Sequence, residues 1–290
     1  MKNITCGFSL FVLVSALSTG CMTPILASAN PPYNQRLLQV RYMPEEPIVK
    51  ALLAKDQEGL MVEVKGAHNI YDPYTGRKLE AAFMGSSYYM SPTEDGIKWG
   101  QEFPGVFQIV ILPDEPSAGV FVNGISYPGA VVFYQVDNRL AAVNWVSIDD
   151  FTASLVASNF SPKETNQKEV LAAYAIAIRT KAYDQTLSSD NQYWDVNAET
   201  CGYRGNAVVR TDAPFKESMN ATKKIIMTGE QQSNVSGKFD RKVIEDIRQK
   251  MPLAGVQALA KDGKDAKIIL HRYFPDQNLA VAEPPQSTGR

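Results

Sequence analysis

The sequence contains little cysteine, and this shortage excludes a fold held together by internal disulfides. Among 290 residues there are three cysteines, Cys6, Cys21 and Cys201. We interpret the stretch around Cys6 as an export signal, and Cys21 as a residue that is acylated or removed when that signal is processed. Cys201 then has no partner within the chain. The fold must therefore be stabilised by its apolar core.

An excess of charge of either sign is also missing. The chain has 29 Lys and Arg against 31 Asp and Glu, which gives a net charge of -2. Such a surface provides no long-range attraction to nucleic acid or to an anionic membrane. We therefore expect no nucleic-acid partner.

Potential metal ligands are scarce as well. The two histidines of the chain, His68 and His271, are far apart in the sequence, and Cys201 has no second Cys or His within ligand spacing. The sequence therefore predicts neither a metal site nor a cofactor.

The apolar run near the start of the chain is too short to span a membrane as a helix. Residues 8–17 follow Lys2 and are typical of a secretory signal within residues 1–29. Ser18-Thr19-Gly20-Cys21 resembles a bacterial lipobox, with Cys21 as the acylated first residue. The alternative is cleavage after Ala29, at Ala27-Ser28-Ala29, which gives a soluble periplasmic protein. We prefer the first interpretation, in which a lipid on Cys21 is the membrane anchor.

The first half of the remaining chain has the alternation of β-strands. Residues 30–47 are rich in Pro, Asn and Gln and are typical of a tether. Strands are predicted at 48–54, 60–65, 107–112, 119–122, 131–136 and 140–146, with turn residues at Asp72–Gly76, Asn123-Gly124 and Asp137-Asn138. This half is predicted to be β-rich.

The period changes to that of helices after Trp145. Ser147 is a typical N-cap, and a longer helix is predicted over 167–183. Shorter elements are predicted at 220–227 and 241–250, and helical segments at 255–261 and 267–273. The Pro-rich tail, 283–290, is predicted to be disordered. The fold class is therefore α+β, with an N-terminal β-rich half followed by a helical, mixed half, in one domain over 48–282.

Several segments match, in order, the landmarks of one bacterial family. Residues 48–54 are similar to the family's first strand, and residues 123–129 (NGISYPG) are similar to its N-G-x-x-Y-x-G hairpin. Residues 143–151 (VNWVSIDDF) resemble its V-N-x-v-x-l-E-x-Y-L helix start, and residues 170–180 (VLAAYAIAIRT) resemble its A-L-K-A-Q-A-V-A-A-R-T helix. Residues 267–275 (KIILHRYFP) resemble its I-L-x-H-Y-Y-P terminus. The chain thus resembles the SpoIID/LytB family, which includes amidase enhancers and whose characterised enzymes are lytic transglycosylases that cleave peptidoglycan glycan strands lacking stem peptides. The resemblance implies a SpoIID-like domain over 48–282.

The resemblance also implies that the catalytic residue of the family has been replaced. The family's catalytic Glu falls on Asn159, and an amide neither donates nor accepts a proton near neutral pH. The family's G-H-G-V-G segment falls on residues 246–250, where it is absent, and its S-G-G-x-T segment is unrecognisable between Met227 and Asp240. Glu164, five residues beyond Asn159, is the catalytic candidate that remains.

Glycan-contact candidates follow from the same resemblance. These are Asn159, Arg179, Asp195, Tyr203 and Trp194, with Tyr88, Tyr89, Trp99 and Gln192 as further groups that stack on sugars or bind hydroxyls. The competing interpretation is that such aromatic residues fill the core and that Arg179 is a buried structural charge.

The sequence therefore predicts an exported protein of a bacterial cell envelope, either periplasmic or membrane-anchored. It is expected to bind peptidoglycan glycan strands, or an amidase or division protein, without the family's catalysis. An active lytic transglycosylase that uses Glu164 and an envelope scaffold without glycan affinity are the alternatives.

Overall fold

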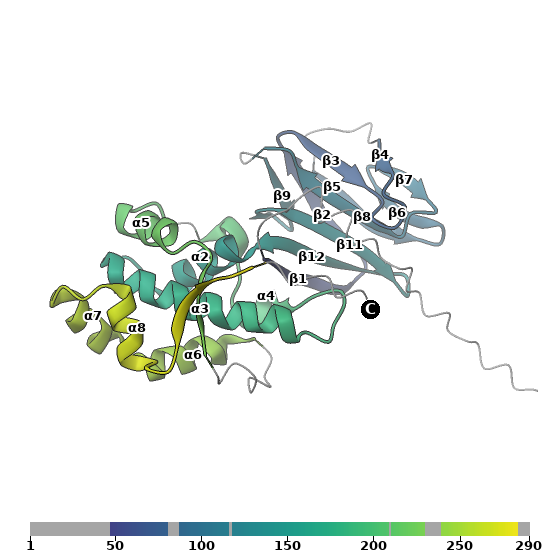
Figure 1. Ribbon diagram of the computed structural model, residues 1–290. Coiled ribbons are helices and arrows are strands. Elements are labelled where there is room, and N and C mark those ends of the chain that lie inside the picture. Colours follow the sequence, from purple (N-terminus) through teal and green to yellow (C-terminus); the bar gives the residue numbers. More distant parts are fainter. Residues whose placement is uncertain (1–46, 81–86, 116–117, 209, 230–238, 284–290) are drawn as a thin grey trace, which may run out of the picture. The chain divides into compact units, whose positions relative to one another are not determined.

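The computed structural model describes residues 47–80, 87–115, 118–208, 210–229 and 239–283 (Figure 1). The predicted signal, its lipidation site Cys21, the tether up to residue 46 and the tail beyond Glu283 lie outside these ranges. In the described part of the chain, no helix combines the length and the apolar character that crossing a membrane requires.

The β-rich half forms two sheets. The larger has the strand order β13-β1-β12-β11-β8-β3-β4, and the smaller has the order β10-β9-β2-β5-β6-β7. The first consists of β1 (Ile48–Gln57), β3 (His68–Tyr71), β4 (Lys78–Leu79), β8 (Gln108–Pro113), β11 (Ala130–Val136), β12 (Arg139–Ser147) and β13 (Val196–Asn197). The second consists of β2 (Leu60–Lys65), β5 (Ser87–Thr93), β6 (Gly96–Trp99), β7 (Gln101–Pro104), β9 (Gly119–Val122) and β10 (Ile125–Tyr127).

The two sheets share an apolar core. Strand β12 contacts β5, and β8 contacts β6 and β9. Phe133, Met90 and Trp99 are among the large side chains buried there. The indole N–H of Trp99 donates to the carbonyl of Val62 at 3.2 Å. Trp99 is therefore a core residue, and its candidacy as a sugar-stacking group is wrong.

The second half is organised around one buried helix. Helix α3 (Lys168–Ser188) has Ala at positions where a larger side chain would hold neighbours apart, and it is buried along most of its length. It contacts α2 (Ile148–Asn159), α5 (Ala213–Ala221), α6 (Arg241–Lys250), α7 (Leu253–Lys261), α8 (Ala266–Tyr273) and β14 (Ile225–Thr228). Strand β14 pairs with β15 (Asn278–Val281), and α4 (Ala198–Cys201) and a 3-10 turn (Gly205–Ala207) follow β13.

The α+β class and the order of its halves are confirmed. Strands β2 and β9 have the predicted bounds, and the Ser147 hydroxyl accepts from the Asp150 N–H at 3.0 Å, as an N-cap does. The single element predicted at 220–227 is wrong, because the end of α5 and the strand β14 share this stretch. The short strands β3, β5, β6 and β7 were not predicted, since their apolar alternation is weak.

A buried hydrogen-bond network joins the large sheet to the helical half. The Asn144 amide NH₂ donates to the carbonyls of Pro128 at 2.8 Å and Ala130 at 2.9 Å. Its carbonyl oxygen accepts from the Tyr203 hydroxyl at 2.7 Å. Asn144 is fully buried, so each of these partners replaces water that the side chain lost on folding.

We predict that Tyr203→Phe destabilises the protein by about 1–3 kcal/mol, because it leaves the buried Asn144 carbonyl oxygen without a donor. Urea unfolding followed by circular dichroism measures the change. Tyr89→Phe is the matched control, since that ring is exposed and its variant should stay within about 0.5 kcal/mol of wild type. Equal effects of the two substitutions would contradict the structural role of the Tyr203 hydroxyl.

Candidate functional site

Asn159 is the last residue of α2, and its side chain forms a hydrogen bond within that helix. The amide NH₂ donates to the Leu155 carbonyl at 2.8 Å, one turn earlier. The Asn159 backbone carbonyl accepts from the Arg248 guanidinium at 3.2 Å. The residue at the family's acid position therefore stabilises the end of a helix.

Arg248 of α6 covers this helix end. Besides Asn159, its guanidinium contacts a carboxylate oxygen of Glu164 at 3.6 Å and lies over the Phe160 ring, 5.1 Å from the centroid. Arg248 belongs to the segment that stands in place of the family's G-H-G-V-G. A large cation thus occupies a place where the resemblance implies glycines that let a ligand approach.

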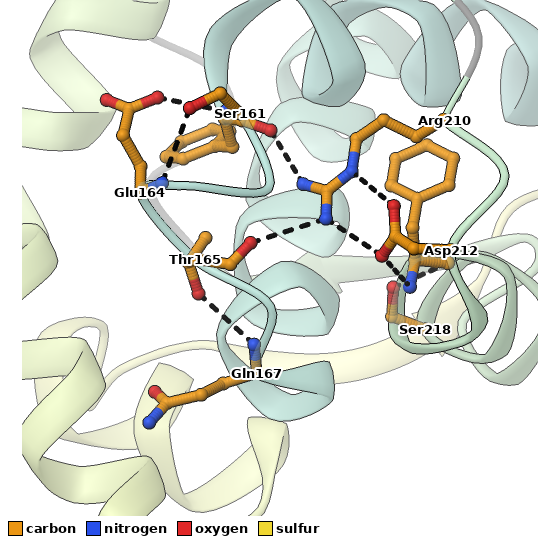
Figure 2. Close-up of polar contacts among 9 residues, drawn as sticks. Ser161, Glu164, Thr165, Gln167, Arg210, Asp212 and Ser218 are labelled. Carbon is orange, nitrogen blue, oxygen red and sulfur yellow. Dashed lines mark hydrogen bonds and ion pairs between the residues drawn. The ribbon is translucent and has the colours of Figure 1, made fainter.

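The Glu164 carboxylate forms a hydrogen bond within the turn that contains it. It accepts from the Ser161 backbone N–H at 2.9 Å, while the Glu164 N–H donates to the Ser161 hydroxyl at 3.3 Å (Figure 2). The Ser161 N–H holds the pKa of Glu164 below its usual range, and Arg248 acts in the same direction. A general acid for glycoside cleavage needs a raised pKa, so this environment is opposite to the one required.

The loop between α2 and α3 is fixed by Arg210. Its buried guanidinium donates to the Phe160 carbonyl at 2.6 Å and to the Thr165 carbonyl at 3.3 Å (Figure 2). Two further bonds, both 2.9 Å, join it to the Asp212 carboxylate. Because Arg210 holds both sides of the loop, Glu164 does not sit on a segment free to swing inward. No local sequence pattern indicates this clamp, which joins residues about 50 positions apart.

Arg179 is a structural charge. Its side chain is completely buried and forms an ion pair with Asp149 at 2.7 Å, and it donates to the Ile225 carbonyl at 3.1 Å. The neighbouring Thr180 hydroxyl accepts from the Met227 N–H at 2.8 Å. Glycan contact by Arg179 is therefore wrong for this structure, and the same holds for Tyr203, whose hydroxyl is used by Asn144.

Trp194 and Asp195 meet at an open pocket of about 760 Å³. The loop that carries them follows α3 and is attached to β1 by a pair of bonds with Lys50. The Asp195 N–H donates to the Lys50 carbonyl, and the Lys50 N–H donates to the Asp195 carboxylate, both at 2.8 Å. Burial raises the pKa of Asp195 to about 6, although the charge of Lys50 opposes this shift. The Lys50 ammonium also donates to the Gln192 carbonyl at 3.2 Å.

The sequence-predicted glycan contacts do not form one site. The loop after Asn159 leads into the first turn of α3, whereas Trp194 and Asp195 follow its last turn. With 21 residues and a rise of 1.5 Å each, the two ends of α3 lie about 30 Å apart. Tyr88 and Tyr89 are exposed on β5 of the smaller sheet, in a third place.

Cys201 is a core residue. It is buried, and its thiol contacts the Ala198 carbonyl at 3.7 Å. Burial raises the pKa of the thiol to about 12, which keeps it protonated and unreactive. Among the residues that the structure describes, no group of His, Cys, Asp and Glu is arranged to hold a metal ion.

The raised pKa of Asp195 predicts a pH-dependent stability. A carboxyl with a folded pKa of about 6 and an unfolded pKa of about 3.9 binds its proton more tightly in the folded state. Its contribution to stability is therefore fully present below about pH 3.9 and is lost as the pH rises to about 6. Asp195→Asn keeps an acceptor for the Lys50 N–H but has no charge to bury.

We expect Asp195→Asn to gain stability relative to wild type between about pH 4 and pH 7, by an amount on the order of 1–3 kcal/mol. Urea unfolding at a series of pH values across this range measures the difference. A difference that does not change with pH would show that the carboxyl titrates normally.

Comparison with known proteins places a family match on the segment that contains both ends of α3. The SpoIID family model, described as Stage II sporulation protein, matches residues 136–228. An uncharacterized protein of Chlamydia pneumoniae is 28% identical over 240 residues, which cover 82% of this chain and 83% of that protein. An uncharacterized protein of Chlamydia muridarum is 28% identical over 247 residues, 84% of this chain and 81% of its own length.

A third similar protein, an uncharacterized protein of Brachyspira hyodysenteriae, is 25% identical over 154 residues, 53% of this chain and 40% of that protein. No solved structure matches. The matched segment runs from the end of β11 through α2, α3 and β14, where the helix motifs were recognised in the sequence. Residues 136–228 of this chain are thus similar to the SpoIID family.

Proposed function

We propose that this protein is a SpoIID-related module of a bacterial cell envelope that binds peptidoglycan glycan strands without cleaving them. The match of residues 136–228 to the SpoIID family model supports a sporulation- or cell-wall-related role. One observation carries the non-catalytic part of the proposal. The family's acid position holds the Asn159 amide, which bonds to its own helix under the Arg248 guanidinium.

The chemistry of glycan cleavage explains why this arrangement is unsuitable. A carboxyl must protonate the glycosidic oxygen while the sugar ring develops positive charge. The Asn159 amide has no proton to transfer at neutral pH. The Arg248 charge beside it would also repel the developing positive charge on the ring. Two independent features therefore oppose cleavage at this position.

An active transglycosylase that uses Glu164 is the competing proposal. Its carboxyl is the acidic group that follows the family's acid position most closely in the α2–α3 loop. The lowered pKa, the bonds to Ser161 and the Arg210 clamp on the loop count against it. An envelope scaffold or amidase partner that has lost glycan affinity is the remaining alternative, and binding measurements separate it from our proposal.

The place of action belongs to the same proposal. We propose an exported protein that is anchored through a lipid on Cys21, or that is soluble and periplasmic after cleavage following Ala29. The sequence patterns around these residues support export.

We predict that the purified protein pellets with peptidoglycan sacculi and releases no anhydro sugars on mass spectrometry. Asn159→Glu should remain inactive, because Arg248 would pair with the new carboxylate and lower its pKa. Glu164→Gln should bind sacculi as wild type does. Sugar release by wild type that disappears in Glu164→Gln would favour the transglycosylase, and failure to pellet would favour the scaffold.

A further inference from the structure

The pocket beside Trp194 is lined by several hydrogen-bonding side chains and lies apart from Asn159. Three side-chain amides line it, those of Gln185, Asn191 and Asn197. Each uses its carbonyl oxygen to accept a backbone N–H. Gln185 accepts from Phe239 at 3.0 Å, Asn191 from Tyr193 at 2.8 Å and Asn197 from Thr200 at 3.2 Å.

These bonds fix which end of each amide is left for a ligand. A backbone N–H can only donate, so the side-chain atom that meets it must be the oxygen. No hydrogen bond from the three NH₂ groups to another described residue is formed. The pocket is therefore lined by three residues whose amide oxygens are used by the backbone and whose NH₂ groups remain available as donors.

The other lining groups complete a site for a sugar. The Trp194 indole offers an apolar face, and the Asp190 and Asp195 carboxylates can accept from hydroxyl groups. The volume of about 760 Å³ lies in the range of about 300–1,000 Å³ found for ligand pockets. The amide donors favour a ligand that is rich in carbonyl oxygens.

We infer that this pocket binds the N-acetylated sugars of a glycan strand, with the acetamido carbonyl accepting from the amide NH₂ groups and a sugar ring lying on Trp194. The inference deepens the proposed function and rests on it. It places glycan recognition beyond the last turn of α3. Phe160, which follows Asn159, packs on Tyr174, and the 14 residues from Tyr174 to Ser188 span about 20 Å of the helix.

The variants that test this inference change one atom at each position. Gln185→Glu and Asn197→Asp keep the carbonyl-type oxygen that accepts from Phe239 or Thr200, but they replace the NH₂ donor by a second acceptor. Asn197→Asp also preserves a good N-cap for α4. Asn123→Asp is the matched control, because the Asn123 oxygen likewise accepts a backbone N–H, that of Met61 at 3.0 Å, in the smaller sheet.

Binding is measured by calorimetry with chitotetraose, a neutral N-acetylglucosamine oligomer, and with cellotetraose, which lacks the acetamido groups. We expect wild type and Asn123→Asp to bind chitotetraose in preference to cellotetraose. The double variant Gln185→Glu/Asn197→Asp, and separately Trp194→Ala, should lose affinity by about tenfold or more, since amide donors or stacking area are removed. Circular dichroism confirms that each variant is folded.

Each contrary outcome has a distinct meaning. If wild type pellets with sacculi but the pocket variants keep its affinity for chitotetraose, the pocket assignment is overturned and the proposed function stands. Equal affinity of wild type for cellotetraose overturns recognition of the acetamido group. If wild type binds neither sacculi nor chitotetraose, both the inference and the glycan-binding function are overturned.

Discussion

The buried charge of Arg179 is the constraint on which the helical half depends. A guanidinium removed from water is tolerated only with a close counter-charge and satisfied hydrogen bonds, and here these come from Asp149 and the Ile225 carbonyl. The partners lie at the start of α2 and on β14, so one residue in α3 fixes three elements. Fixing α3 in turn fixes its two ends. One carries the α2–α3 loop, and the other carries the pocket beside Trp194.

Residues that match the family motifs are mostly framework residues. Asn144 and Tyr203 are buried and bonded to each other, and the buried Arg179 is bonded to Asp149 and Ile225, which explains why the fold needs those side chains. Two departures from the family pattern lie together, because the Arg248 guanidinium donates to the Asn159 carbonyl. The fold therefore does not need a carboxyl at position 159. An amide that bonds to the preceding helical turn satisfies the same local structure.

The sequence was informative where structure is local or strongly patterned. The alternation of β2, the cap at Ser147 and the apolar length of α3 were predictable, although α3 continues to Ser188. The misassigned stretch near Ile225 shows the limit, because β14 pairs with β15 about 50 residues later. For the site, the replacement at Asn159 was visible in the sequence. The contact from Arg248, 89 positions away, and the burial of Tyr203 depend on packing that no local pattern records.

In our proposal, α3 separates the glycan-binding pocket from the family's acid position. A general acid must lie within hydrogen-bond reach, about 3 Å, of the oxygen it protonates. A sugar held against Trp194 lies beyond the reach of the Asn159 side chain, since Phe160 packs on Tyr174 and the 14 residues from there to Ser188 span about 20 Å. Glycan strands are long, however, and one strand can contact both ends of the helix. In our proposal the pocket holds a strand on the protein whether or not the region around Asn159 carries an acid, so an amide at position 159 is compatible with glycan attachment without cleavage.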